Sequence, residues 1–188
     1  MPKYDDGSES PLPQTSCLIT THDGSGKAIF YERPSKSDDV CLKRMGPAAF
    51  NVLYATSSVP VNFTKDKDLN EFIDNKNVMP IFIPGGTLVR MVDLGPGECS
   101  PIHRTKSLDY GVVLNGEIEL ILEDLETGPV KLMKAGDVSV QRATLHAWRN
   151  HSKTEWARML YVLQESTAPE ANGQPLEEDH GGIELPAQ

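Results

Sequence analysis

The stretch GECSPIHRTKSLDYGVVLNG, residues 97–116, carries most of the information about the fold. A polar segment with His103 and Thr105 leads into a run of strand-forming residues that contains Asp109 and Gly111. Because side chains alternate between the two faces of a strand, His103 and Thr105 share one face, and so do Asp109 and Gly111. We expect both pairs to look into a barrel, where the inward glycine would leave space for a ligand.

A second polar stretch, GDVSVQRATLHAWRN at residues 136–150, follows later in the chain and places His146 and Trp148 on one face. Two imidazoles and one carboxylate on two strand pairs are the donor set of facial-triad metal sites. The sequence therefore predicts His103, Asp109 and His146 as ligands of a divalent metal such as Zn, Fe, Mn or Ni. A metal-free pocket, in which these side chains hydrogen-bond to one another, is the alternative.

Around these stretches the chain has the pattern of a β protein. Short runs rich in Val, Ile, Leu and Tyr alternate with glycine or proline breaks from about residue 79 to residue 164. Eight such runs favour a sandwich, jelly roll or barrel over a parallel α/β sheet. They are IFIP, GTLVRMVDL, DYGVVL, EIELILE, VKLM, DVSVQR, HAWRN and RMLYVLQ.

The segments outside this region suggest one domain with two tails. Residues 1–15 are polar and proline-containing, which predicts a flexible N-terminal arm. Residues 16–165 form the predicted domain, with the barrel core at about 79–165, a hairpin across THDGSGKAIF and one or two short helices, one of them between Thr64 and Asn75. Residues 166–188 are predicted to be an acidic tail or strap.

Composition narrows the range of partners. The chain has 188 residues, enough for one sizeable core, and a formal net charge of −9, which argues against nucleic acid as a partner. No apolar run approaches the length of a membrane span, and the first residues lack the apolar centre of a secretory signal. Three widely spaced cysteines are expected to be free thiols. We therefore expect a cytoplasmic protein with a small-molecule substrate.

The stretch at residues 97–116 resembles the first motif of the cupin superfamily, which has glycine, His-x-His, a later Glu and a final glycine. Gly97, His103 and Gly116 stand at the matching positions. Thr105 stands where the second His is usual, and Asp109 stands where Glu is usual. A hydroxyl is a poor metal ligand, so the replacement by Thr105 weakens the expected metal site.

The second cupin motif begins with Gly-Asp and ends with His and a later Asn. Gly136, Asp137, His146 and Asn150 resemble it, although the segment before His146 is one residue short and Arg142 stands where Pro is common. The resemblance covers roughly residues 17–165 and is greatest to small single-domain cupins of bacteria and fungi. It implies an all-β cupin jelly-roll barrel and, for some members, the tailoring of polyketide or aromatic acid metabolites.

The functional hypothesis that follows is a small metal-assisted lyase or isomerase. It would decarboxylate, dehydrate or isomerise an organic acid or an aromatic polyketide-type metabolite, with Asp109 or His146 moving a proton. One alternative is an Fe(II) dioxygenase, since two His and a carboxylate leave open positions for oxygen. Another is a module that binds a small molecule without turning it over.

Six further side chains are candidates for the pocket. Arg142 and Tyr110 are predicted to assist catalysis, and four residues are predicted to contact substrate, namely Thr105, Trp148, Arg158 and Tyr161. For the two arginines a salt bridge on the outer face is the alternative, and for the tyrosines a place in the core or an interface. Open sheet edges and the N-terminal hairpin further predict a homodimer.

Overall fold

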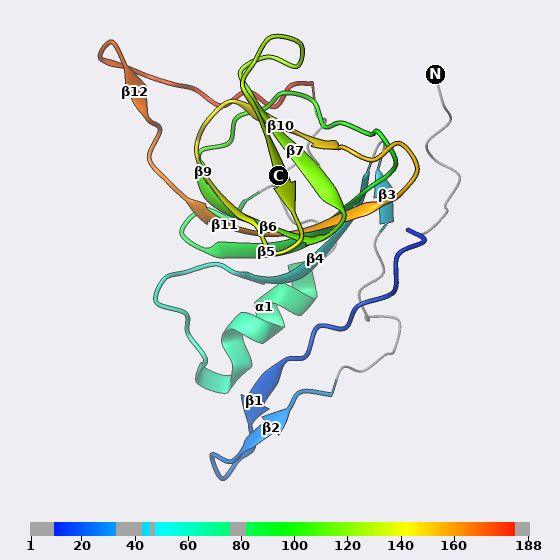
Figure 1. Cartoon of the computed structure of the whole chain (residues 1–188). Coiled ribbons are helices and arrows are strands. Elements are labelled where there is room, and N and C mark those ends of the chain that lie inside the picture. Colours follow the sequence, from blue (N-terminus) through cyan, green and yellow to red (C-terminus); the bar gives the residue numbers. More distant parts are fainter. Residues whose placement is uncertain (1–9, 33–42, 46–47, 76–81, 183–188) are drawn as a thin grey trace.

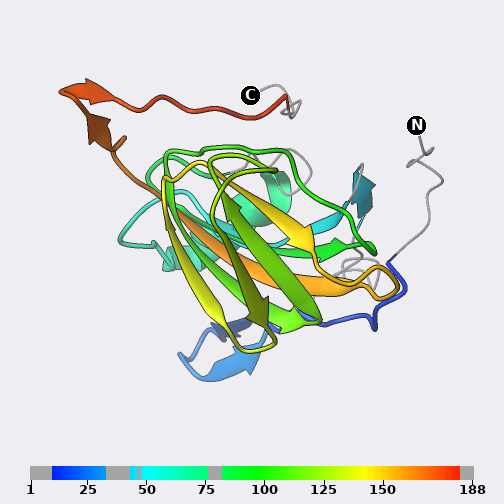
Figure 2. The same cartoon turned by 45° about the horizontal axis from the view of Figure 1, so that its top comes forward.

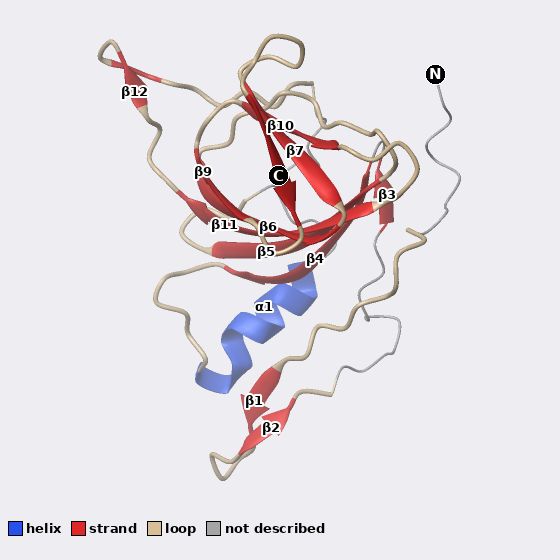
Figure 3. Ribbon diagram, viewed as in Figure 1, coloured by secondary structure: helices blue, strands red, loops and turns tan. Residues whose placement is uncertain are grey.

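The computed structural model describes residues 10–32, 43–45, 48–75 and 82–182, and two facing β-sheets dominate it (Figures 1 and 3). The larger sheet has the order β3-β4-β5-β11-β6-β9, and the smaller one has the order β10-β7-β8. All neighbours are antiparallel. The strands are β3 (Lys43–Met45), β4 (Ala48–Thr56), β5 (Thr87–Leu94), β6 (Ser107–Asn115), β7 (Glu117–Leu122), β8 (Val130–Lys134), β9 (Val138–Arg142), β10 (His146–Asn150) and β11 (Ala157–Glu165).

The inner faces of the two sheets enclose one apolar core. Leu88 and Met159 from the larger sheet are fully buried with Ile118 from the smaller sheet, and Trp148 packs among them. The alternation of the strands explains this, because every second residue of an antiparallel strand meets the same face. In β6 the inward residues are Ser107, Asp109, Gly111 and Val113, all of them buried. The predicted all-β jelly roll is confirmed.

Two details of the strand prediction are wrong. The run IFIP forms no strand within its described part, residues 82–84, because a turn that includes Gly85 and Gly86 follows at once. Phe82 and Ile83 instead pack against the core as loop residues. The barrel also begins earlier than residue 79, since β4 pairs with β5 along its whole length and is an integral strand of the larger sheet.

The predicted hairpin and helix are both present and lie below the larger sheet (Figure 1). The hairpin consists of β1 (Thr20–His22) and β2 (Ala28–Phe30). The helix α1 (Lys67–Asn75) follows a 3-10 turn, η2 (Thr64–Asp66), and buries Leu69 and Phe72. The ring of Phe72 lies 4.9 Å from that of Tyr54 on β4, which fixes the helix against the outer face of the sheet.

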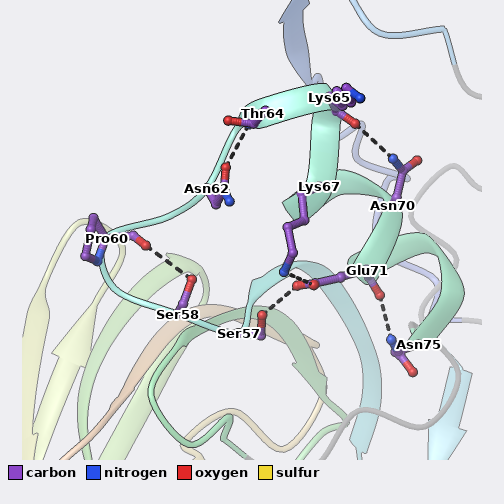
Figure 4. Close-up of polar contacts among 10 residues, drawn as sticks. All are labelled: Ser57, Ser58, Pro60, Asn62, Thr64, Lys65, Lys67, Asn70, Glu71 and Asn75. Carbon is purple, nitrogen blue, oxygen red and sulfur yellow. Dashed lines mark hydrogen bonds and ion pairs between the residues drawn. The ribbon is translucent and has the colours of Figure 1, made fainter.

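Polar contacts hold the two ends of this helix (Figure 4). Ser57, at the end of β4, donates to the carboxylate of Glu71 at 2.6 Å, and the same carboxylate accepts from Lys67. Asn75 donates to the backbone carbonyl of Glu71 at 2.8 Å. No helix of the described residues is long and apolar enough to cross a membrane.

The N-terminal segment lies against the sheet from residue 10 onward, so the boundary predicted for a flexible arm at residue 15 is corrected. Arg158 on β11 donates through Nη1 to the carbonyl oxygen of Pro13 at 2.7 Å. Cys17 packs with Met91 and Ala49 on the outer side of the larger sheet. Residues 1–9, the remainder of the predicted arm, lie outside the described residues.

The same Arg158 forms a buried ion pair across neighbouring strands. Its Nε and Nη2 atoms each lie 2.6 Å from one carboxylate oxygen of Asp93 on β5, and the register places the two residues opposite each other. Asp93 is completely buried and Arg158 is 5 % exposed. Such a bidentate pair is satisfied only as a unit, because either charge alone would remain buried without a counter-charge.

We therefore expect Asp93→Ala to destabilise the protein by about 3–5 kcal/mol. The matched control is Glu71→Ala, which breaks the exposed Lys67–Glu71 pair and is expected to cost under about 1 kcal/mol. Urea denaturation at neutral pH measures both values. Equal losses in the two variants would contradict the structural role given to the buried pair.

After β11 the chain first leads away from the barrel and then runs back over it (Figure 2). It forms a small hairpin of β12 (Glu170–Ala171) and β13 (Gln174–Pro175), followed by an extended segment to residue 182. The sequence predicted an acidic tail or a strap for this region, and residues 166–182 have the form of a strap. Residues 183–188 lie outside the described part of the chain.

Candidate active site

His103 and His146 lie side by side, one from each of the two motif-bearing segments. Their backbones form a reciprocal bridge, with N···O distances of 2.9 and 3.0 Å, and their rings are 4.4 Å apart between centroids. Each Nδ1 lies 2.9 Å from a backbone carbonyl oxygen, that of Pro101 for His103 and that of Thr144 for His146. Because a carbonyl only accepts, Nδ1 carries the hydrogen and Nε2 keeps its lone pair.

Burial keeps both imidazoles neutral. It lowers the pKa of His146 to about 4, and the neighbouring His103 adds to this shift. The pKa of His103 is also lowered, chiefly by burial, although its contact with the Pro101 carbonyl opposes the shift. At neutral pH the pair therefore presents two uncharged rings that can accept a proton or a ligand at Nε2.

Asp109 lies on the inward face of β6 and is buried, at 6 % exposure. Burial raises the pKa of its carboxyl to about 6, against the opposing effects of a hydrogen bond with Ser107 and the charge of Arg90. Its Oδ1 atom is buried and has no hydrogen-bond partner among the described residues. An oxygen in this state costs free energy unless a ligand or solvent molecule meets it.

Arg90 is the charged neighbour of Asp109, and the sequence interpretation missed it. It stands on β5 between the inward residues Leu88 and Val92, opposite Tyr161 of β11. Burial lowers the pKa of its guanidinium to about 10, while the charges of Asp109 and Tyr161 act to raise it. The alternation of GTLVRMVDL was a usable signal, because it puts a single arginine on an otherwise apolar inward face.

Aromatic rings connect the imidazole pair with Tyr161. Trp148 is 5 % exposed, and its ring lies 5.5 Å from that of His146 and 5.5 Å from that of Tyr161, edge-on in both cases. The Tyr161 hydroxyl donates to the sulfur of Met159 at 2.9 Å, and burial raises the pKa of this phenol well above its usual range. Trp148 and Tyr161 therefore lie inside the barrel as part of its apolar core, which for Tyr161 is the alternative stated above, and their contact with substrate stays a prediction.

Thr105 faces inward as expected, but its hydroxyl is already engaged. It lies 2.7 Å from the hydroxyl of Ser107, and both residues are buried. We refer to Arg90, Asp109, His103, His146 and Tyr161 as the inward polar cluster.

Three candidates do not face this cluster, and their assignment to the pocket is corrected. Tyr110 alternates with the inward Asp109 and is 37 % exposed on the outer face. Arg142 likewise alternates with the buried Gln141 and is exposed. Arg158 points outward to Asp93, as described above. Each of the three residues is the direct chain neighbour of an inward residue, so strand alternation turns its side chain to the outer face.

The space expected at Gly111 is occupied by protein. A Cβ atom at this position would lie 2.8 Å from Ser139 Oγ and 3.1 Å from a ring carbon of Tyr161. The glycine therefore serves close packing of β6 against its neighbours, and not the binding of a ligand.

The family resemblance implies a metal, and the donor set fits it only in part. The free Nε2 lone pairs of His103 and His146 suit a divalent cation. However, no three His, Cys, Asp or Glu side chains of the described residues lie close enough together to hold an ion. Asp109 is thus not grouped with the two imidazoles, and the residues do not fit the predicted site of two His and one carboxylate.

A surface cavity of about 200 Å³ lies elsewhere, lined by Glu119, Arg149, Asn150, His151 and Lys153. Its main charges are paired with one another, since Glu119 accepts from Arg149 and from His151 Nδ1, both at 2.6 Å. The buried groups with shifted pKa values are all elsewhere, so we locate the candidate active site at the inward polar cluster.

Comparison with known proteins identifies the family. No family model matches the chain. A "Phomopsin biosynthesis cluster protein D" of Diaporthe leptostromiformis is 42 % identical over 178 residues, which is 93 % of this chain and 89 % of the relative. The "Cupin-domain-containing oxidoreductase srdB" of Neurospora crassa is 39 % identical over 163 residues, covering 87 % and 80 %.

Among solved structures, the Cnp3 cupin domain of Schizosaccharomyces pombe is similar over 79 % of this chain and 86 % of that domain, with a TM-score of 0.47 and 14 % identity. The extent of the sequence matches, together with the jelly-roll fold, places the chain in the cupin superfamily. In particular, the chain belongs to the family of cupin-domain-containing proteins that includes srdB of Neurospora crassa.

The raised pKa of Asp109 predicts a pH-dependent effect on stability. Its folded-state pKa of about 6 exceeds the ordinary pKa of an aspartic acid, 3.8, so folding favours the protonated form and stability is lost as the pH rises through 6. Asp109→Asn is therefore expected to be more stable than the wild type at pH 7.5, on the order of 1–3 kcal/mol. At pH 3.5 the two proteins should be equally stable in urea denaturation. A difference that does not change between these pH values would contradict the shift.

Proposed function

We propose that the chain is an enzyme of secondary-metabolite biosynthesis that moves a proton on an acidic substrate. The carrying observation is a buried carboxyl with a pKa of about 6 beside a partly buried arginine. A general acid or base works best when its pKa lies near the working pH, and Asp109 meets this condition. Decarboxylation, dehydration and isomerisation are the reactions that such a group can serve, on an organic acid or an aromatic polyketide-type metabolite.

Arg90 would hold the anionic part of the substrate. A guanidinium binds a carboxylate or enolate oxygen through charge-assisted hydrogen bonds, which are stronger where water is excluded. Its neighbour Asp109 has a buried oxygen without a partner among the described residues, which a substrate hydrogen-bond donor or acidic C–H can approach. Trp148 and Tyr161 supply the flat apolar walls that an aromatic substrate needs.

Proton transfer would then use Asp109 as the primary group. In its ionised form the carboxylate removes a proton from the substrate. In its protonated form it returns a proton to carbon after loss of carbon dioxide or in an isomerisation, or gives it to the hydroxyl that leaves as water in a dehydration. The neutral imidazoles of His103 and His146 can accept a hydrogen bond or proton at Nε2 on the same side of the barrel. The relatives named as biosynthesis cluster proteins support the metabolic setting.

Deuterium exchange tests this proposal. The protein is incubated in D2O with a panel of aromatic and β-keto carboxylic acids, and incorporation at carbon is followed by mass spectrometry. We expect Asp109→Asn to reduce exchange by about 100-fold or more. Arg90→Gln should raise KM by roughly tenfold or more, through loss of the charge-assisted contact. The matched control is Arg142→Gln, the same substitution on the outer face, which should leave exchange unchanged. Equal effects of the two arginine changes would refute the role of Arg90.

A second candidate is a metal-dependent oxidoreductase, favoured by the relatives named as cupin-domain-containing oxidoreductases. A metal at the imidazole pair would supply redox or Lewis-acid chemistry. Oxygen consumption that depends on added iron, without deuterium exchange, would favour this candidate. Binding of the acids without either reaction would favour the non-catalytic module. The homodimer stays a prediction.

The ligand set makes a separate prediction for metal content. Since the two imidazoles are adjacent and Asp109 is not grouped with them, any divalent metal bound here should be lost in His103→Ala and retained in Asp109→Ala. Elemental analysis of protein purified without added metal, and again after equilibration with Zn²⁺, gives the stoichiometry. Complete loss of metal in Asp109→Ala would contradict this ligand set and support the three-ligand site predicted from the sequence.

A further inference from the structure

The strap after β13 pairs with the segment that carries His103. Asp179 and Arg104 form a reciprocal antiparallel bridge with N···O distances of 2.5 and 3.0 Å. The carboxylate of Glu178 accepts from the backbone N–H of Lys106 at 3.0 Å, and the carbonyl of Glu177 accepts from the Arg104 guanidinium at 3.4 Å. The strap is therefore paired, through one isolated bridge, with a segment that is also bridged to His146.

Charge supports this pairing. Glu177, Glu178 and Asp179 are consecutive acids, and the segment they meet contains Arg104 and Lys106. Opposite charges on adjacent strands stabilise their alignment, and salt weakens such exposed pairs. The acidic residues of the strap thus lie beside the basic residues Arg104 and Lys106 of the same protein.

The end of the strap lies in close contact with the backbone of Ile102. Gly181 has φ +58°, and a Cβ atom there would lie 2.1 Å from the carbonyl oxygen of Ile102 and 3.0 Å from Pro101 Cβ. Pro101 is the residue whose carbonyl oxygen holds the Nδ1 hydrogen of His103. Only glycine permits this contact, so any larger residue must push the strap away from the Pro101–Ile102 backbone.

His180 lies between these two anchors. Its chain neighbours Asp179 and Gly181 contact Arg104 and Ile102, the two residues that flank His103. Its Nδ1 atom is buried and has no hydrogen-bond partner among the described residues, while Glu178 lies 3.9 Å from Nε2. Nothing in the sequence indicates that His180 returns to the barrel.

We propose that residues 176–182 form a strap that controls access to the His103–His146 pair and brings His180 to its edge. When docked, the strap covers the backbone that positions His103. When released, it exposes that segment and withdraws the third imidazole. This role is independent of the reaction that the inward polar cluster performs.

The test compares two glycine substitutions. Gly181→Ala introduces the clash with Ile102, whereas Gly182→Ala, at φ +78° with no atom within 4 Å of the added Cβ, is the matched control for backbone strain. The probe is diethyl pyrocarbonate, which acylates accessible neutral imidazoles, and peptide mass spectrometry follows each histidine. His151, which is exposed and distant in the chain from the strap, serves as the internal reference.

We expect acylation of His103 to be about fivefold or more faster in Gly181→Ala than in the wild type, because local release of the strap opens the site. Gly182→Ala should react like the wild type, and His151 should react equally in all three proteins. Hydrogen exchange at the Arg104 and Asp179 amides reports whether the strap has left. Raising the salt concentration should also speed acylation of His103 in the wild type.

Two results would overturn the proposal. One is a released strap, seen as lost protection of both amides, with an unchanged rate at His103. The other is full protection of these amides in both Gly181→Ala and Glu178→Ala, since the contacts removed would then not hold the strap. Melting curves of all variants show whether a general loss of structure contributes to faster acylation.

Discussion

The backbone pairing between residues 98–103 and β10 is the constraint on which the site depends. Asn150 donates its N–H to the Glu98 carbonyl, Ser100 donates to the Trp148 carbonyl, and His103 exchanges two bonds with His146. The side chain of Asn150 adds three donated bonds at 2.8–3.0 Å to backbone carbonyls, those of Leu94, Gly95 and Glu155. These bonds fix the two imidazoles at ring contact, because each ring position follows from its strand register.

Burial in the barrel interior is the second constraint, and it shifts the pKa values of acids and bases in opposite directions. The charged form of any side chain is disfavoured in the barrel interior, so the pKa of Asp109 rises and that of His146 falls. The order of the two pKa values is therefore inverted, at about 6 for Asp109 and about 4 for His146. The barrel interior thus contains a carboxyl that can exchange a proton near physiological pH and, apart from it, two imidazoles that are already deprotonated. Arg90 keeps the one permanent charge in this group.

The strap pairs with the backbone of the segment that carries His103. An uncovered strand edge presents unpaired N–H and C=O groups, which proteins cover, pair or charge. Here the chain covers the edge beside His103 with its own acidic C-terminal segment. The consequence is that an edge-protecting element and the candidate active site share the residues Pro101–Lys106. A movement of the strap would therefore change the contacts of Ile102 and Arg104, the two residues that flank His103.

The sequence by itself determined the fold class and most elements of the site. Alternating apolar residues, regular glycine breaks and the two polar motifs were enough to predict the jelly roll, the hairpin, the helix and the inward positions of Thr105, Asp109, His146 and Trp148. These are local properties, since strand periodicity depends only on neighbouring residues. The motif pattern also pointed to the family, through His103, Gly116 and Asn150.

Only the tertiary structure decided which inward residues meet. It placed Arg90 beside Asp109, kept Asp109 apart from the imidazoles, turned Arg142, Arg158 and Tyr110 outward, and returned His180 to the barrel. Register across strands, the point at which each strand begins and the path of a long terminal segment depend on contacts between residues far apart in the chain. The physical reason is that periodicity assigns a side chain to a face, whereas distances between side chains on different strands come from packing and pairing of the whole barrel.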